Sequence, residues 1–315
     1  MLYRLRKTVP PILISLCLLT IAPSGYAKIY KWVDSEGNVH FSDREDHRVE
    51  QEVVNVKPIA SDWSPFDIKV GAVGVELSDA DNQRIVDDVN NVYEFFARVL
   101  SFNVYSTVPV NILMFRDGVE YRNYLIENDR GMAAASTGLY IPSEHQIVVY
   151  MQEKRNLTFE TIKHEVSHAV VDALVPYVPA WLNEGLAEQM EMLERDESGL
   201  YFERHPVNRW VVNQAREQDA LADIDQFLKL PSDKWRHSDF SGIGSLRAQA
   251  GQFIYFLLSN TNGRDFLVRL MHNFDRGDRT LSYYLVDENY IGGVTMLDLN
   301  WRRWLHGQGG EFVRL

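Results

Sequence analysis

Two histidines four residues apart constrain this chain more than any other feature of its sequence. They lie in residues 161–170, TIKHEVSHAV. In a helix with 3.6 residues per turn, His164 and His168 project from neighbouring turns of one face, so both imidazoles can reach a single metal ion. Glu165 lies beside them, and apolar residues recur at the spacing of a buried helical face; these are Ile162, Val166, Ala169, Val170 and Ala173. A metal-binding helix is therefore favoured over the alternative, a chance motif in a helix with ordinary core histidines.

Two histidines need a further protein ligand. A catalytic zinc ion usually has three protein ligands, nitrogen or carboxylate in type, and keeps one position for water. Residues 179–188, PAWLNEGLAE, form a second amphipathic segment that carries Glu184, our candidate for this ligand. Asp172 is a weaker alternative, because it would have to bind from one turn beyond His168. A third histidine at position 174 would mark another zinc pattern, but that residue is Leu174. The spacing therefore predicts a zinc site of two histidines and one glutamate.

Two polar neighbours of Glu184 are candidates for supporting the ligands. Glu188 lies one turn later, which suits a carboxylate that orients a ligating histidine through its other ring nitrogen. An exposed carboxylate is an equally good interpretation of Glu188. Asn183, immediately before Glu184, is the other candidate.

HEVSH followed by WLNEGLAE resembles the gluzincin clan of zinc metallopeptidases. In that clan HExxH is paired with a glutamate on the next helix, commonly within NEG or NEA. The resemblance implies that His164, His168 and Glu184 bind one Zn²⁺ ion and that Glu165 is the general base. The 15 residues between His168 and Glu184 suit the smaller peptidase-MA-like domains. The GxMEN signature of aminopeptidase N-like enzymes is absent, and the motifs cover residues 161–188.

A zinc peptidase also needs a residue that stabilises the oxyanion formed when water attacks the peptide carbonyl. The sequence identifies this residue less clearly. Related domains often place a tyrosine at the start of the helix that corresponds to residues 246–259, where this chain has Arg247. A guanidinium can stabilise a tetrahedral oxyanion, so Arg247 is a candidate. Tyr255, His205 and His237 are others, each with an ordinary structural role as the alternative.

Residues 1–27 have the pattern of a secretory signal peptide. A basic start is followed by an apolar run at 11–21 and by a small-x-small cleavage site that ends at Ala27. The apolar run is too short for a permanent membrane span. Cys17 lies within it, so the mature chain has no cysteine. We therefore expect a periplasmic or secreted protein.

The chain is acidic, with a formal net charge of −12 for all 315 residues. Loss of the predicted signal removes three positive charges and gives −15. Such a charge disfavours binding to nucleic acid or to an anionic membrane. With the motifs, it favours an exported zinc endopeptidase that acts on peptide or protein. A cell-envelope binding or scaffolding protein with structural zinc, or a cell-wall amide hydrolase, is the alternative.

Residues 28–57 are predicted to form a small separate β-hairpin domain. KIYKWV and NVHFSD are strand-like runs around a glycine turn, and the following VEQEVVNVK can add a strand. The segment resembles the uncharacterised exported domain family numbered 4124, through its YKWVD, glycine turn and FSD elements. Binding a cell-envelope partner is the role that we consider for this domain. Residues 58–66 are the expected linker.

Residues 67–315 are predicted to form an α+β, zincin-like domain. We expect a small mixed sheet above the HExxH helix and a mainly helical lower lobe. A helix over 78–101, a buried strand over 108–115 and a helix capped by Asp117 precede a strand hairpin. That hairpin turns near Pro142, and either Gly138 to Tyr140 or Ile147 to Tyr150 is the edge strand beside the cleft. After Glu188 the pattern is helical to residue 305.

Overall fold

A computed structural model describes the chain in two compact units, Met1–Trp63 and Ser64–Leu315. The described residues are 28–33, 39–42, 52–55, 68–102, 110–232, 234–235, 245–307 and 310–315, the first three ranges as backbone only. The predicted signal segment, the predicted linker up to residue 66 and His237 lie outside them. None of the helices in the described part is long and apolar enough to cross a membrane.

The N-terminal unit contains a three-stranded antiparallel sheet of order β2-β1-β3. Its strands are β1 (Lys28–Val33), β2 (Val39–Ser42) and β3 (Glu52–Asn55). The register of β1 and β2 pairs Trp32 with His40. The predicted hairpin is therefore present, and the following segment adds the third strand.

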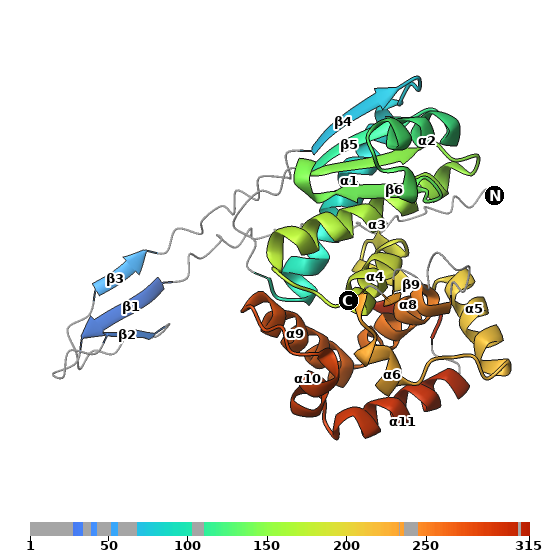
Figure 1. The fold of residues 1–315 in the computed structure, drawn as a ribbon. Helices are drawn as coiled ribbons and strands as arrows, with labels where there is room; N and C mark the ends of the chain where they lie inside the picture. The colour runs from blue at the N-terminus through green and yellow to red at the C-terminus, as the bar shows by residue number, and fades with distance from the viewer. Residues whose placement is uncertain are drawn as a thin grey trace, which may run out of the picture. The chain divides into compact units, whose positions relative to one another are not determined.

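The second unit is a mixed α+β structure whose main sheet has the order β4-β5-β7-β6 (Figure 1). Its strands are β4 (Ile68–Val73), β5 (Val110–Phe115), β6 (Gly138–Ile141) and β7 (Gln146–Tyr150). β6 runs antiparallel to β7, and the other pairs are parallel. Since β7 lies between β5 and β6, the prediction of Ile147 to Tyr150 as an edge was wrong, and Gly138 to Tyr140 is the edge.

Alternation of side chains along the strands gives the sheet two apolar faces. Ile112 and Ile147 face the main core with α1 (Asp79–Glu94) and α3 (Arg155–Leu174). Phe115 and Val148 face a smaller core with α2 (Gly118–Glu127). The predicted caps Ser78 and Asp117 begin α1 and α2 through side-chain acceptors. Helix α1 continues as one π turn, Phe95–Val99, into the main core.

Helix α3 lies between the sheet and the helices below it, and it is buried on nearly every side (Figure 1). Four of the five predicted core residues are buried, but Ala173 in the last turn is exposed. Lys163 is fully buried, and its Nζ donates to the carbonyl oxygen of Leu193 at 2.7 Å. This bond fixes α3 against the segment that follows α4.

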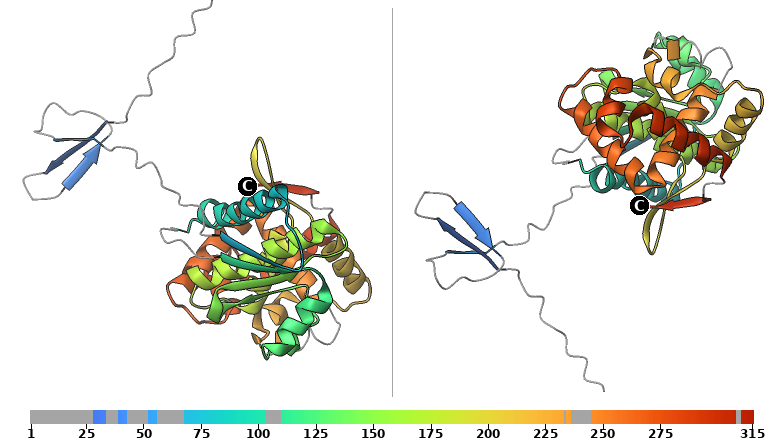
Figure 2. Two further views of the ribbon diagram at one scale, coloured as in Figure 1. Left: turned by 90° about the horizontal axis from the view of Figure 1, so that it is seen from above. Right: turned by 90° about the horizontal axis from the view of Figure 1, so that it is seen from below.

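The lower lobe is mostly helical, and α9 to α11 are the helices nearest the viewer in the right view of Figure 2. Its helices are α4 (Ala180–Met190), α5 (Pro206–Glu217), α6 (Ile224–Lys229), α8 (Ser245–Leu258), α9 (Thr261–Asp275), α10 (Ser282–Asn289) and α11 (Gly293–His306). Trp301 is buried in α11 and stacks on Trp304 with centroids 5.4 Å apart. Both tryptophans pack on the domain.

The prediction of helices alone after Glu188 was wrong. A hairpin of β8 (Leu193–Asp196) and β9 (Gly199–Glu203) follows α4, and β10 (Phe312–Arg314) pairs with β9. Leu200 and Phe202 alternate with exposed or half-buried residues, and Gly199 takes φ +118° at the turn. The period of two and the glycine were therefore visible in the sequence.

Helices α4 and α8 pack closely because two glycines face the contact. A Cβ on Gly185 would lie 2.8 Å from the backbone oxygen of Ala250. A Cβ on Gly251 would lie 2.7 Å from Nδ2 of Asn208 and 2.9 Å from Cβ of Glu188. Contacts this short cannot form without a backbone shift. The glycine of the NEG motif is therefore required by packing.

We predict that Gly185→Ala lowers the free energy of unfolding by about 1–3 kcal/mol, the usual cost of overpacking a core. Urea denaturation measures this change. Gly131→Ala is the matched control, because its Cβ would meet only Ile126 at 3.6 Å. An unchanged stability for Gly185→Ala, or equal losses in both variants, would contradict the packing argument.

Candidate metal centre

A cleft of about 1070 Å³ runs between β6 and the helices of the lower lobe. Its walls carry polar residues from α3, α4 and α8. They are His164, Glu165, His168, Asn183, Glu184 and Arg247. All of the candidates for metal binding and for the general base therefore line one cleft.

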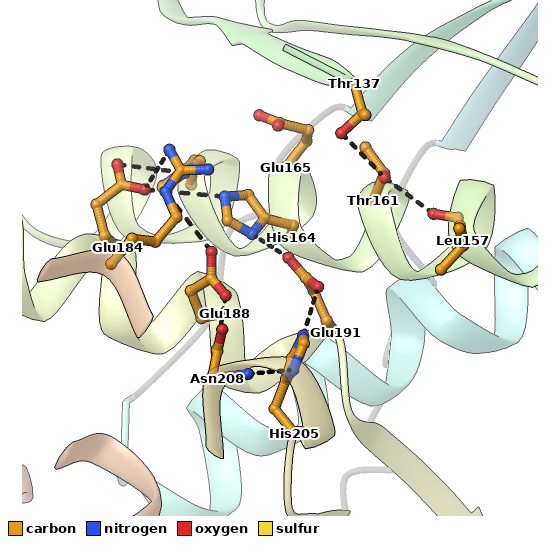
Figure 3. Close-up of polar contacts among 12 residues, drawn as sticks. Thr137, Leu157, Thr161, His164, Glu165, Glu184, Glu188, Glu191, His205 and Asn208 are labelled. Atoms are coloured by element: carbon orange, nitrogen blue, oxygen red, sulfur yellow. Dashed lines mark hydrogen bonds and ion pairs between the residues drawn. The ribbon is translucent and has the colours of Figure 1, made fainter. Parts of the chain in front are cut away.

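Two histidines of α3 and one glutamate of α4 bring one ligand atom each to within 4.8 Å of one another. Figure 3 shows His164 and Glu184 of this group. Nε2 of His164 lies 3.9 Å from Oε2 of Glu184, and Nε2 of His168 lies 3.8 Å from Oε1. Ligand atoms on a tetrahedral zinc ion are about 3.4 Å apart, as its bond lengths of roughly 2.0–2.2 Å require. Oε2 of Glu184 is buried, and Nη2 of Arg247 lies 3.0 Å from it. The two distances from Glu184 to the imidazoles are therefore within about 0.5 Å of the spacing around a zinc ion.

Each histidine is oriented through its other ring nitrogen. Nδ1 of His168 lies 3.2 Å from Oδ1 of Asn183, the supporting residue that we expected. Nδ1 of His164 lies 2.7 Å from Oε1 of Glu191. Both acceptors favour a proton on Nδ1, so in the neutral rings the lone pair is on Nε2, the nitrogen nearer to Glu184.

The residue that orients His164 was not predicted. Our candidate was Glu188, but its Oε2 accepts from Nδ2 of Asn208 at 2.8 Å. Glu191 takes the role because it lies where α4 ends, and the chain turns there toward β8. An acidic residue between Met190 and Met192 was the only sequence signal, and it is weak.

Glu165 occupies the wall of the cleft on the side of the edge strand. Its Oε2 accepts the backbone N–H of Tyr140 at 2.8 Å. Gly138 allows this approach, because a Cβ there would lie 2.6 Å from Cγ2 of Thr161 and 3.1 Å from Cγ of Glu165. One oxygen of Glu165 is thus anchored by β6, beside the candidate metal ligands.

The candidates for oxyanion stabilisation are in different environments. Arg247 lines the cleft, but its Nη2 lies 3.0 Å from Oε2 of Glu184 and its Nε 3.6 Å from Oε1 of Glu188. Tyr255 was a wrong choice, because it is buried and donates to the carbonyl oxygen of Gly310 at 2.8 Å. Tyr255 follows Arg247 by eight residues, about 12 Å along α8, and its ring packs against Trp304 of α11.

Two other candidates also have their own partners. Asp172 accepts from Oη of Tyr140 at 3.0 Å and is not part of the group of converging ligand atoms. His205 lies outside the cleft lining, with its Nε2 3.2 Å from Oε2 of Glu191. It therefore contacts the support of a ligand rather than a substrate.

Two carboxylates of the cluster, Glu184 and Glu191, are held in the ionised form by their neighbours. Burial opposes ionisation of Glu191, yet hydrogen bonds from His164 and His205 lower its pKa to about 2. Burial raises the pKa of Glu184, but His168 and Arg247 outweigh it, and the pKa is lowered. Burial opposes the charged form of His164, but Glu191 raises its pKa to about 9. Such a group of carboxylates suits a divalent cation.

We predict that zinc binding at pH 7 releases about one proton, because His164 is protonated below its pKa of about 9 and must lose that proton to bind through Nε2. Zinc affinity should therefore rise with pH up to about 9. Calorimetric titrations in buffers of different ionisation enthalpy count the released protons. Identical heats in all buffers would contradict the prediction.

Comparison with protein families supports the resemblance of the N-terminal unit. Residues 16–65 match a model described as Domain of unknown function (DUF4124). The match includes β1, β2 and β3 and begins within the predicted signal segment. The description names no activity. Comparison with curated proteins gave no match.

Proposed function

We propose that this protein is an exported zinc metallopeptidase of the gluzincin type, in which the second unit is a zincin-like domain. The observation that supports this most strongly is the convergence of His164, His168 and Glu184 in the cleft, with Glu165 beside them. A structural zinc site needs no general base, so Glu165 favours an enzyme over a scaffold. Export rests on the signal pattern of residues 1–27.

The donor set suits zinc. Two imidazoles and one carboxylate are the protein ligands of many catalytic zinc sites, and they leave one coordination position open. A zinc ion held there would supply an acidic water and polarise the carbonyl group of a substrate. Asn183 and Glu191 would keep the two imidazoles in the required tautomer.

Glu165 would act as general base and then as general acid. The Tyr140 N–H holds one of its oxygens, so the carboxylate cannot swing away from the cleft wall. Glu165 would accept a proton from the attacking water and pass it to the leaving amine. Acid–base assistance of this kind contributes about 10²–10⁴-fold to the rate.

The edge strand β6 supports an extended peptide as the substrate. An edge strand offers backbone groups that can pair with another chain in extended conformation. On β6 the Tyr140 N–H already donates to Glu165 and the Gly138 carbonyl accepts from Ser136, so a peptide would pair with the remaining groups of this edge. Tyr140 and Gly138 line the cleft, and Thr161 and Val171 of α3 form the adjacent wall. A polypeptide lying beside β6 would pass directly over Glu165. We therefore propose endopeptidase activity on peptide or protein.

We predict that Glu165→Gln retains zinc but hydrolyses casein about 10²–10⁴ times more slowly than the wild type. Casein digestion and the zinc content of the same samples measure the two effects. Glu153→Gln is the matched control, because Glu153 is exposed just before α3. An active, zinc-loaded Glu165→Gln variant would refute the role. Parallel digestion of peptidoglycan tests for cell-wall amide hydrolysis.

Glu184→Ala should lose most of its zinc during dialysis, whereas the wild type should retain one ion per chain, because two histidines alone bind zinc weakly. Atomic emission spectroscopy of residues 28–315 measures the ratio. Glu197→Ala is the control, since Glu197 is exposed in the turn between β8 and β9. Equal retention by Glu184→Ala and the wild type would show that another residue is the third ligand.

A further inference from the structure

Two of the candidate ligands are connected by polar contacts that pass through α5 (Figure 3). The first half of the connection starts at His164. Its Nδ1 donates to Oε1 of Glu191 at 2.7 Å, and Oε2 of Glu191 lies 3.2 Å from Nε2 of His205. Glu191 therefore accepts from two histidines, one on each of its oxygens.

The position of His205 determines which of its nitrogens carries the proton. His205 is the N-cap of α5, and its Nδ1 accepts the backbone N–H of Asn208 at 3.2 Å. A nitrogen that accepts a hydrogen bond carries no proton, so Nε2 of the neutral ring is the donor. The cap thus directs an N–H group at Glu191.

The second half of the connection returns from α5 to the third ligand. Nδ2 of Asn208 donates to Oε2 of Glu188 at 2.8 Å. Oε1 of Glu188 lies 3.6 Å from Nε of Arg247, and Nη2 of Arg247 lies 3.0 Å from Oε2 of Glu184. The first turn of α5 therefore supports His164 through Glu191 and Glu184 through Glu188.

We propose that His205 and Asn208 are positioning residues of the metal centre, and that they act through Glu191 and Glu188. This inference rests on the proposed zinc site. A buried carboxylate needs a donor for each oxygen to keep one orientation. Oε1 of Glu191 accepts from His164, and among the described residues His205 is the donor to Oε2. Without it the carboxylate can rotate, and the His164 ring loses its fixed orientation.

The proposal is tested by measuring zinc affinity in competition with a chelating indicator. His205→Ser keeps a side-chain acceptor for the helix cap but removes the donor to Glu191. We expect its zinc affinity to fall about 10- to 100-fold, the usual effect of losing support for a ligand. The metal-free variant loses one hydrogen bond to the carboxylate of Glu191 and should melt at a lower temperature, so the affinities are compared at a temperature at which both metal-free proteins are folded. Asn260→Ser, at the N-cap of α9, is the matched control and should bind zinc normally.

A second variant keeps the proposal testable if His205→Ser does not fold. Glu191→Gln has one acceptor oxygen, so it can accept from His164 or from His205 but not from both. Its affinity should fall by a similar factor, and Glu203→Gln on the exposed side of β9 is its control. In the double variant His205→Ser and Glu191→Gln, the two losses should not multiply, because both remove one contact.

Wild-type affinity in both single variants would overturn the proposal, and so would losses that multiply in the double variant. Two zinc ions per chain would also overturn it, because His164, Glu188 and Glu191 could hold the second ion in place of the hydrogen bond. A wild type that binds one zinc ion but cleaves neither casein nor peptide would overturn only the proposed peptidase. A wild type that binds no zinc would overturn both.

Discussion

The arrangement of the cleft depends on the close packing of α4 against α8. Gly185 and Gly251 remove the side chains that would hold the two helices apart. Helix α4 carries Glu184 and Glu188, and α8 carries Arg247, so the short separation allows one guanidinium to lie near both carboxylates. Arg247 offsets part of the negative charge that burial would otherwise make costly. The backbone contact between the helices is thus a condition for the electrostatics of the site.

Each carboxylate of the cluster has a different partner. Glu165 accepts a backbone N–H of β6, Glu191 accepts from two histidines, and Glu188 accepts from Asn208. Glu184 faces His164 with Oε2 and His168 with Oε1, and Arg247 approaches its Oε2 at 3.0 Å. A buried carboxylate needs compensating positive charge. Arg247 supplies part of it, and a cation between the carboxylate and the two imidazoles would supply the rest.

The sequence predicted those parts of the site that depend on local spacing. His164 and His168 share a face because they lie on one helix, and Asn183 and Glu184 were recognisable from the segment that follows. Glu191, His205 and Asn208 could not be found in this way, because their contacts require α5 and the turn into β8 to approach α3. Tyr255 was a wrong candidate because it lies about 12 Å further along α8 than Arg247, where it is buried and donates to the carbonyl oxygen of Gly310.

Helix α3 allows neighbouring residues to serve different walls of the cleft. Successive residues of a helix are rotated by about 100°, so His164 and Glu165 point in different directions although they are adjacent. His164 faces α4 and the turn that carries Glu191, whereas Glu165 faces β6 and its Tyr140 N–H. In the proposed mechanism, the lower lobe therefore fixes the metal ligands and the sheet fixes the general base. Because one helix carries His164, His168 and Glu165, the base keeps its place relative to the two histidines.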